Sequence, residues 1–347
     1  MRRLLVLVVL ALTAACAPQR PPTPGTSASV AGARQPLVIY SPHGDEVLKP
    51  FKERFAAAHP EIEVTTIDMG AQGVLDRLRA EQANPGADLW WGAPHTMFAQ
   101  AADLGLLEPY QPTWSAQLDA AKRDPQHRWY GQYVTPVVAV YNSTAIQPDA
   151  APRDWDDLLA EKWKGKILLR DPKDSGTMRT FIAAMILRQP SVDAGYAWLR
   201  KLDANTVAYP ASPALLFRQL QAQEGVLTPW NLRDYYIQRR DHGYQLGLVL
   251  PASGSPLILD GIALVKGGRH LAAAKVFYEF VTAPEQLAWA AERFYCLPAR
   301  GDVDPARLPA DMPKTLRELK LDWARIRAEG DAWQTHWSEQ IKGKGGA

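Results

Sequence analysis

The sequence predicts a two-lobed α/β protein in which each lobe is a mostly parallel sheet flanked by helices. With 347 residues, the chain is long enough for two domains of ordinary size. Short β-rich apolar runs alternate with longer runs of helical periodicity, which indicates parallel strands covered by helices on both faces. Two long extended apolar runs, 134–142 and 255–265, predict a hinge of two strands that cross between the lobes. A small ligand is then expected in the cleft between the lobes.

Three strand and helix pairs, taken in chain order, predict the first lobe. Each strand is a short run of β-branched and aromatic residues, and each helix carries apolar residues three or four positions apart. Pro60, just past the first helix, is typical of a helix end. The expected strands are 37–40, 62–67 and 88–91, with a turn at 92–94, and the expected helices are 45–58, 73–82 and 95–104.

The second lobe is predicted between the two crossings. The expected strands are 166–169, 207–209 and 225–228, and the expected helices are 176–187, 192–202 and 213–223, with a further helix that starts at Asp154. After the second crossing, the helical tail 271–342 is expected to pack on the first lobe. The predicted boundaries are 36–135 with 262–347 for the first lobe, and 136–261 for the second lobe with the hinge crossings.

The first 35 residues predict an exported protein on a tether. A basic start precedes the apolar run 4–12, which is far shorter than the roughly 20 residues needed to span a bilayer. We interpret residues 1–16 as a signal peptide and the Pro-, Ser- and Thr-rich residues 17–35 as an extended tether. The small residues before Cys16 resemble a bacterial lipobox, which implies a lipid anchor on Cys16. Thr13 stands where that motif usually has Leu, so export without lipidation stays open as the alternative.

Composition and motifs exclude several classes of function. A formal charge of +2 gives no field that would favour nucleic acid as a partner. Two cysteines, Cys16 and Cys296, allow neither a disulfide framework nor a thiolate metal site, and Cys296 is expected to be a small buried residue. The sequence contains no motif of the common hydrolases, zinc proteases or dinucleotide-binding enzymes, and its seven histidines are scattered singly. We therefore expect neither catalysis nor a cofactor.

Residues 171–177 form the first candidate binding segment, because they follow a predicted strand and open a predicted helix. The free N–H groups of a first helical turn attract anions. Ser175 and Thr177 add hydroxyl groups, and Gly176 lets a ligand approach the backbone closely. The alternative is that Ser175 only caps the helix.

Further candidates lie at the ends of other strands and in a crossing. Ser41 and His43 follow the first strand, at the carboxyl end where ligands bind to parallel sheets, although a lone histidine in a turn is more often structural. Asp260 lies in the second crossing, where its carboxylate could bind ligand hydroxyls or an amine, or only fix the hinge. Trp91 and Trp230 could stack on a ligand or belong to the core.

Tyr235 and Tyr236 are adjacent residues in a helix expected after the strand 225–228. Phenolate oxygens bind hard Fe(III) ions, whereas neutral phenols form hydrogen bonds or stack. The residues themselves leave both interpretations open, iron ligands or packing residues.

Several segments together resemble the extracellular solute-binding proteins of bacterial ABC importers, in the branch that holds binders of ferric ions, thiamine, polyamine-like compounds, phosphorylated sugars and phosphonates. The segments that carry this resemblance are Tyr40-Ser41-Pro42-His43-Gly44, 87–92, Ser175-Gly176-Thr177, 260–267 and 273–281. The resemblance implies a two-lobe periplasmic-binding-protein fold and a monomer that delivers its ligand to a permease and an ATPase. It also implies a location outside the inner membrane, on the periplasmic or cell-surface side.

The resemblance implies two main ligand classes. In ferric binders a tyrosine pair holds the iron together with an anion, and Glu81, Tyr235 and Tyr236 stand at matching positions, with Fe(III) as cargo rather than cofactor. His43, however, stands one residue early for that pattern. The segments 90–94 and 229–231, which include Trp91, Trp230 and Asn231, look more like binders of phosphorylated sugars and phosphonates. We therefore expect first an anionic ligand that bears phosphate or phosphonate, and next ferric iron or another small molecule. The alternative outside transport is a surface receptor or interaction protein.

Overall fold

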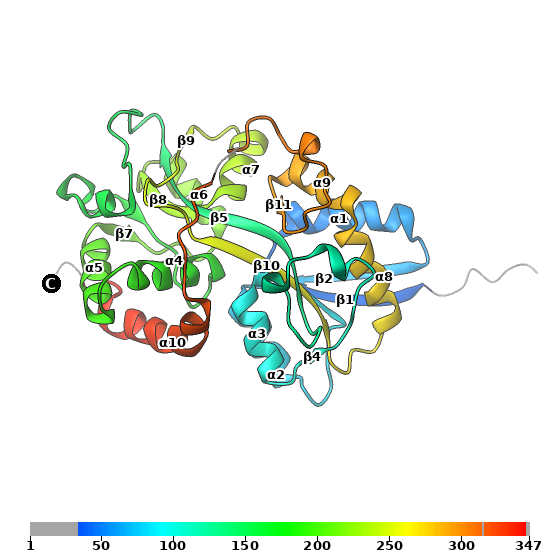
Figure 1. The fold of residues 1–347 in the computed structure, drawn as a ribbon. Coiled ribbons are helices and arrows are strands. Elements are labelled where there is room, and N and C mark those ends of the chain that lie inside the picture. Colours follow the sequence, from blue (N-terminus) through cyan, green and yellow to red (C-terminus); the bar gives the residue numbers. More distant parts are fainter. Residues whose placement is uncertain (1–33, 314–315, 345–347) are drawn as a thin grey trace, which may run out of the picture. The chain divides into compact units, whose positions relative to one another are not determined.

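Alternating strands and helices build the part of the chain that the computed structural model describes, residues 34–313 and 316–344 (Figure 1). The strands are β1 Gln35–Ser41, β2 Ile62–Asp68, β3 Leu89–Pro94, β4 Leu107–Glu108, β5 Tyr130–Asn142, β6 Ile167–Leu168, β7 Thr206–Ala208, β8 Leu227–Asn231, β9 Leu246–Val249, β10 Leu257–Val265 and β11 Leu297–Pro298. The α-helices are α1 Asp45–Ala58, α2 Ala71–Ala80, α3 His95–Asp103, α4 Gly176–Leu187, α5 Val192–Ala204, α6 Pro213–Gln221, α7 Leu232–His242, α8 Leu271–Thr282, α9 Pro284–Phe294 and α10 Trp323–His336. Short 3₁₀ turns include Trp155–Leu159, where the sequence predicted the start of a longer helix, and a π-helical turn covers Trp337–Ile341.

The two predicted crossings are β5 and β10, which pair with each other and connect two groups of strands. The strand order is β2-β1-β3-β10-β5-β8-β6-β7. In the first group β1 runs parallel to β2 and β3, and in the second group β6 runs parallel to β7 and β8. The first half of β5 pairs with β10 and its second half pairs with β8, so one strand belongs to both groups (Figure 1). This arrangement confirms a two-lobe α/β fold with a two-strand hinge.

Two separate apolar clusters form the cores of the lobes. The first packs β1 and β3 against α1, α8 and α9, with Phe51, Trp91 and Phe277 at its centre. The second packs β8 against α4 and α5, with Phe181 and Trp230 buried in it. Each strand group thus has its own core, as the alternation of strands and helices predicted.

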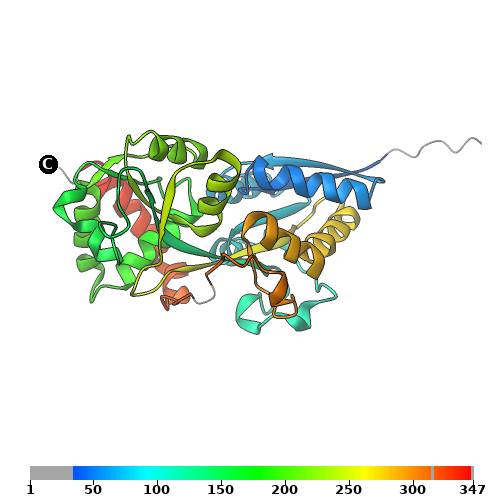
Figure 2. The same ribbon diagram turned by 90° about the horizontal axis from the view of Figure 1, so that it is seen from above.

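The C-terminal tail divides between the two cores, which corrects the expectation that all of it packs on the first lobe. Helices α8 and α9 belong to the first core, but α10 and the following turn pack on the second, beside α4 and α5 (Figure 2). The apolar stripe of Trp333, Trp337 and Ile341 is buried there. Helical periodicity shows that a helix has an apolar face, but it does not show which of two cores receives that face.

Other differences are local. Residues 92–94 continue β3 instead of forming a turn, and Gly92 and Ala93 bend the backbone there with φ values of 89° and 142°. The first strand begins at Gln35, within the predicted tether. The predicted signal peptide and Cys16 lie outside the described residues. Among the residues that the structure describes, no helix is both long and apolar enough to cross a membrane.

Candidate functional site

A cleft of about 570 Å³ lies between the lobes, and the first residues of five helices line it. Helices α1 and α2 come from the first lobe, and α4, α6 and α7 from the second. The N–H groups of a first turn have no partner inside the helix, and they carry the positive end of the helix dipole. Five such ends around one cavity favour a negatively charged group inside it.

The helices of the two lobes begin differently. Ser175 caps α4 by accepting a hydrogen bond from the Met178 N–H at 3.2 Å, and Asn231 caps α7 in the same way. In contrast, α1 and α2 follow Gly44 and Gly70, and neither helix has a side-chain cap. The first N–H groups of α1 and α2 therefore remain available to a ligand.

Arg170 provides a buried positive charge at the end of β6. Its side chain donates hydrogen bonds to the carbonyl groups of Pro210 and Ala211, at 3.3 and 2.7 Å, and lies over the Trp230 ring. Only 7% of the residue is exposed, and burial lowers the pKa of its guanidinium. No carboxylate among the described residues lies within ion-pair distance of Arg170. Asp174, Asp234 and Asp171 oppose this lowering by attraction over a longer range. Since none of them forms an ion pair with Arg170, an anion in direct contact would stabilise the buried charge further.

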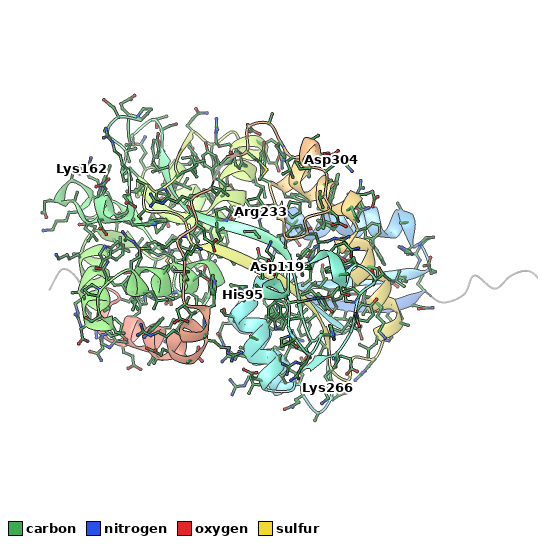
Figure 3. All side chains as sticks on the ribbon, viewed as in Figure 1. His95, Asp119, Lys162, Arg233, Lys266 and Asp304 are labelled. Carbon is green, nitrogen blue, oxygen red and sulfur yellow. The ribbon has the colours of Figure 1, made fainter. Side chains whose placement is uncertain are left out.

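Arg233 is a second buried cation, but neighbouring groups already engage it. Its guanidinium pairs with Asp234 at 3.2 Å and donates to His43 Nδ1 at 3.1 Å. Since arginine can only donate, the proton of the neutral His43 ring is on Nε2, which has no partner among the described residues. Burial and the charge of Arg233 hold the pKa of His43 well below its ordinary value. In Figure 3, Arg233 lies close to the hinge strands.

Asp260 lies in the hinge wall of the cleft. Its carboxylate accepts a hydrogen bond from the Thr135 hydroxyl at 2.8 Å. Burial raises the pKa of Asp260, and the positive charge of Arg233 opposes that rise. Its two expected roles, hinge contact and ligand contact, are both compatible with this position.

The structure places most of the predicted ligand-binding residues together at the cleft. The residues that line it are His43, Ser175, Gly176, Thr177, Trp230, Asn231 and Asp260. Ser41 and Trp91 do not line it. Ser41 is buried and accepts a hydrogen bond from the His43 N–H, while the Trp91 indole donates to Gln132 in the first core.

The three residues expected to hold iron do not meet at the cleft. Glu81 accepts hydrogen bonds from Tyr40 and Arg77 at the far end of α2. The Tyr236 hydroxyl donates to a backbone carbonyl and the ring stacks on Tyr295, while Tyr235 accepts a hydrogen bond from Arg239. The first turn of α7 faces the cleft with Arg233 and Asp234, so the tyrosines come too late in the helix. Within the described residues, no group of three or more His, Cys, Asp or Glu could hold a metal.

Sequence reasoning missed Arg170, Arg233 and the start of α2. Arg170 lies directly after a predicted strand, and Gly70 lies just after another, so the rule that ligands meet the carboxyl ends of strands could have found both. Arg233 is two residues after Asn231 in a segment already singled out. The burial of the two arginines is what suggests a role at the cleft, and burial is not visible in the sequence.

Residues 49–316, most of the chain, match the family model described as bacterial extracellular solute-binding protein. The chain belongs to this family. Solute-binding proteins of ABC importers bind small ligands and work with a permease and an ATPase, and they are transport proteins rather than enzymes. Its relatives are periplasmic proteins, which indicates an exported, periplasmic location for this solute-binding protein too.

Three relatives illustrate the family. A probable ABC transporter periplasmic-binding protein of Sinorhizobium fredii is 26% identical over 305 residues, which cover 86% of this chain and 84% of that protein. A putative 2-aminoethylphosphonate-binding periplasmic protein of Salmonella typhimurium is 27% identical, with 80% and 79% covered. The periplasmic binding protein AfuA from Actinobacillus pleuropneumoniae, solved with fructose-6-phosphate, has a TM-score of 0.78 at 25% identity, with 89% and 99% covered. Ferric-binding proteins share the fold at 18 to 22% identity, which shows the fold alone.

Proposed function

We propose that this solute-binding protein captures an anionic organic molecule bearing phosphate or phosphonate and delivers it to its permease. The observation that carries the proposal is the buried guanidinium of Arg170, which faces the cleft without a carboxylate partner among the described residues. The helix starts around the same cavity add N–H donors and partial positive charge. The names of two relatives, a 2-aminoethylphosphonate binder and a protein holding fructose-6-phosphate, agree with this ligand class.

The two lobes would share the work of binding. Arg170, Ser175 and Thr177 belong to the second lobe, whereas the uncapped starts of α1 and α2 belong to the first. A ligand that touches both walls favours the closed state, because only a difference in affinity between two states shifts their balance. Closure also removes water, which strengthens the charge-assisted hydrogen bonds around the anion.

Replacement of Arg170 tests the proposal. We expect Arg170→Gln to weaken 2-aminoethylphosphonate or glucose 6-phosphate, whichever the protein binds, by about 10- to 100-fold, because a hydrogen bond to a charged group contributes about 1.5–3 kcal/mol. Arg170→Lys should retain part of the affinity. Titration calorimetry measures the change, and Arg218→Gln, on the exposed side of α6, is the control. Binding by Arg170→Gln at wild-type strength, or no binding of any phosphorylated compound, would contradict the proposal.

Ferric iron and a non-transport receptor were the other candidates from the sequence. The ferric interpretation relied on Glu81, Tyr235 and Tyr236, and these residues do not line the cleft. No observation in the described residues favours a receptor without a small ligand.

We also propose that the mature protein is a monomer whose N-terminal Cys16 carries a lipid anchor. The support is the sequence, in which small residues precede Cys16 and a Pro-rich stretch follows it. Acyl chains on Cys16 in the intact mass would bear the anchor out, and an unmodified mature N-terminus would refute it.

A further inference from the structure

Helix α7 of the second lobe presents one side of its surface to the first lobe, where it lies beside α9 (Figure 1). The residues on that side are three or four positions apart, as on one face of a helix: Arg233, Tyr236, Ile237 and Arg240. Arg233 donates to His43 Nδ1 of the first lobe at 3.1 Å, and Ile237 belongs to the first core. Arg240 donates to the carbonyl group of Arg293 in α9. The helix therefore contacts the first lobe along most of its length.

Tyr236 and Tyr295 form an aromatic stack between the lobes. Their ring centroids are 3.8 Å apart and their planes differ by 11°. Tyr295 directly follows α9, which packs in the first core, and it stands just before β11, which pairs with the hinge strand β5. Both phenol groups donate to Asp311, Tyr236 to its backbone carbonyl at 2.9 Å and Tyr295 to its carboxylate at 3.2 Å. The stack thus joins α7 of the second lobe to the end of α9 of the first.

The backbone of Tyr295 is strained. Tyr295 ends α9 with φ 55° and ψ 33°, in the left-handed region that residues other than glycine and asparagine rarely adopt. Glycine would fit this helix end without a steric cost. A tyrosine persists in such a conformation only where other contacts compensate, and the stack on Tyr236 with the hydrogen bond to Asp311 supplies them.

Rotation of one lobe against the other would break the stack, because Tyr236 belongs to α7 and Tyr295 to the end of α9. Rings that are nearly parallel and already in contact cannot come closer, and they lose contact area when they separate or tilt. The stack therefore favours the arrangement of the lobes that the structure shows. In this arrangement Arg179 of α4 reaches Gln72 of α2 across the cleft, at 3.0 Å.

The stack lies outside the cleft. Neither tyrosine lines the cleft cavity, and both line a separate groove of about 340 Å³ together with Arg239 and Arg240. A ligand in the cleft does not contact the two rings. The pair can therefore affect binding only through the position of the lobes.

We propose that Tyr236 and Tyr295 are positioning residues, which form a latch that favours contact between the two walls of the cleft. A contact made in one arrangement of the lobes and lost in the other shifts the balance between them, whatever the ligand is. The latch would raise the affinity for any ligand that touches both walls, because a larger fraction of the protein is already in the binding arrangement. Tyr236 thereby has a role in binding without touching the ligand.

Distances between spin labels on the two lobes measure the latch without any ligand. Ala57→Cys in α1 and Lys201→Cys in α5, both at exposed positions, carry the labels in a Cys16→Ser background, while the buried Cys296 stays unlabelled. Double electron–electron resonance is recorded on protein whose native mass shows no bound molecule. We expect a short separation, with the walls of the cleft in contact, and a long one. The ratio of the long population to the short one is the equilibrium constant for opening.

Replacements of Tyr295 should shift this ratio. Tyr295→Asn removes the ring but tolerates the left-handed backbone, and it should raise the ratio by about 3- to 10-fold, as expected for the loss of one aromatic pair. Tyr295→Gly should do the same without backbone strain, so it serves if the first variant fails to fold. Tyr295→Phe keeps the stack and should keep most of the short population. Tyr110→Asn is the matched control, because its half-buried ring contacts Tyr278 and Glu279, both in α8 of the first lobe.

A raised ratio in Tyr295→Asn and Tyr295→Gly, with Tyr295→Phe and Tyr110→Asn close to the wild type, supports the latch. A wild-type ratio in Tyr295→Asn and Tyr295→Gly, or a shift of equal size in Tyr110→Asn, would overturn it. Because no ligand enters the measurement, either result is independent of the proposed phosphate-bearing ligand.

Discussion

At the scale of single residues, Arg170 and Arg233 are two buried cations that differ in what balances their charge. Arg233 has Asp234 as its ion-pair partner and the ring of His43 as a hydrogen-bond acceptor. Among the described residues, Arg170 donates hydrogen bonds to two backbone carbonyls and lies over the Trp230 ring, but it forms no ion pair, and its nearby carboxylates Asp171, Asp174 and Asp234 act only at longer range. The difference makes Arg233 a structural link between the lobes, whereas we propose Arg170 as a group that binds the ligand.

A buried histidine provides a pH-dependent prediction. Burial lowers the pKa of His95 from 6.5 to about 4, against a hydrogen bond to the Leu259 backbone. Below pH 6.5 the His95 ring binds a proton in the unfolded chain, whereas in the folded protein it stays neutral until the pH approaches 4. The free energy of unfolding should therefore fall as the pH drops from 6.5 toward 4, by up to about 1.4 kcal/mol per pH unit from this one residue.

Urea denaturation at pH 7.5, 6.5, 5.5 and 4.5 measures that loss. His95→Gln should be less stable than the wild type at every pH, because the ring packs on Trp323, but its stability should fall less steeply below pH 6.5. His43, whose pKa is also lowered, acts in the same direction in both proteins. Identical slopes in the wild type and the variant would contradict the assignment.

Sequence reasoning located residues by their place in a strand or a helix, and this sufficed for Ser175, Thr177 and Asp260. It was wrong where a side chain at the same backbone position can point either into the cleft or into a core. Trp91 was expected at the last position of its strand, but it points into the first core, because β3 continues through Pro94. The tyrosine pair has a suitable chemistry, yet α7 directs it away from the cleft. Side-chain direction depends on tertiary packing, which a single sequence does not specify.

At the scale of elements, the starts of α2 and α4 face each other across the cleft, and glycines permit the approach. A Cβ added to Gly176 would lie 2.6 Å from the Pro94 ring of the first lobe. Gly176 is the first residue of α4, where alanine fits the helix well. The glycine thus serves the contact between lobes rather than the helix.

Gly176→Ala should hinder closure without unfolding the protein. We expect the affinity for the phosphorylated ligand to fall by about tenfold or more, because overpacking costs about 1–3 kcal/mol, while the melting temperature of the ligand-free protein stays within a few degrees. Calorimetry and thermal denaturation measure the two effects. Gly330→Ala in α10 is the control, since Gly330 does not line the cleft and a Cβ there would only touch Ile326 at 3.8 Å. Wild-type affinity in Gly176→Ala would show that the lobes need not meet at this point.

Most elements were predictable, because each combines a clear period with start and stop signals. Helix α4 begins and ends where its pattern predicted, at Gly176 and Leu187. Helices α5 and α6 also begin where their patterns predicted, at Val192 and Pro213. The segment 154–159 was less predictable, because a cap and a few apolar residues suit a 3₁₀ turn as well as an α-helix.

At the scale of the whole molecule, contacts between the lobes continue beyond the cleft. Arg179 of α4 donates to Gln72 of α2 at 3.0 Å, and Gln100 of α3 donates to Asp331 of α10 at 3.1 Å. Arg179 also pairs with Asp331, so α10 contacts both lobes. The tail therefore contributes contacts between the lobes that its predicted place on the first lobe would not provide.

We propose that the cleft binds an organic anion with phosphorus rather than iron. Native mass spectrometry with phosphorus and iron analysis of the protein, purified without added ligand, tests it most directly. We predict a colourless protein that carries a phosphorus-containing small molecule and no stoichiometric iron, and that loses the molecule in Arg170→Gln. Stoichiometric iron with a tyrosinate-to-iron absorption band, abolished by changing Tyr235 or Tyr236, would contradict the account.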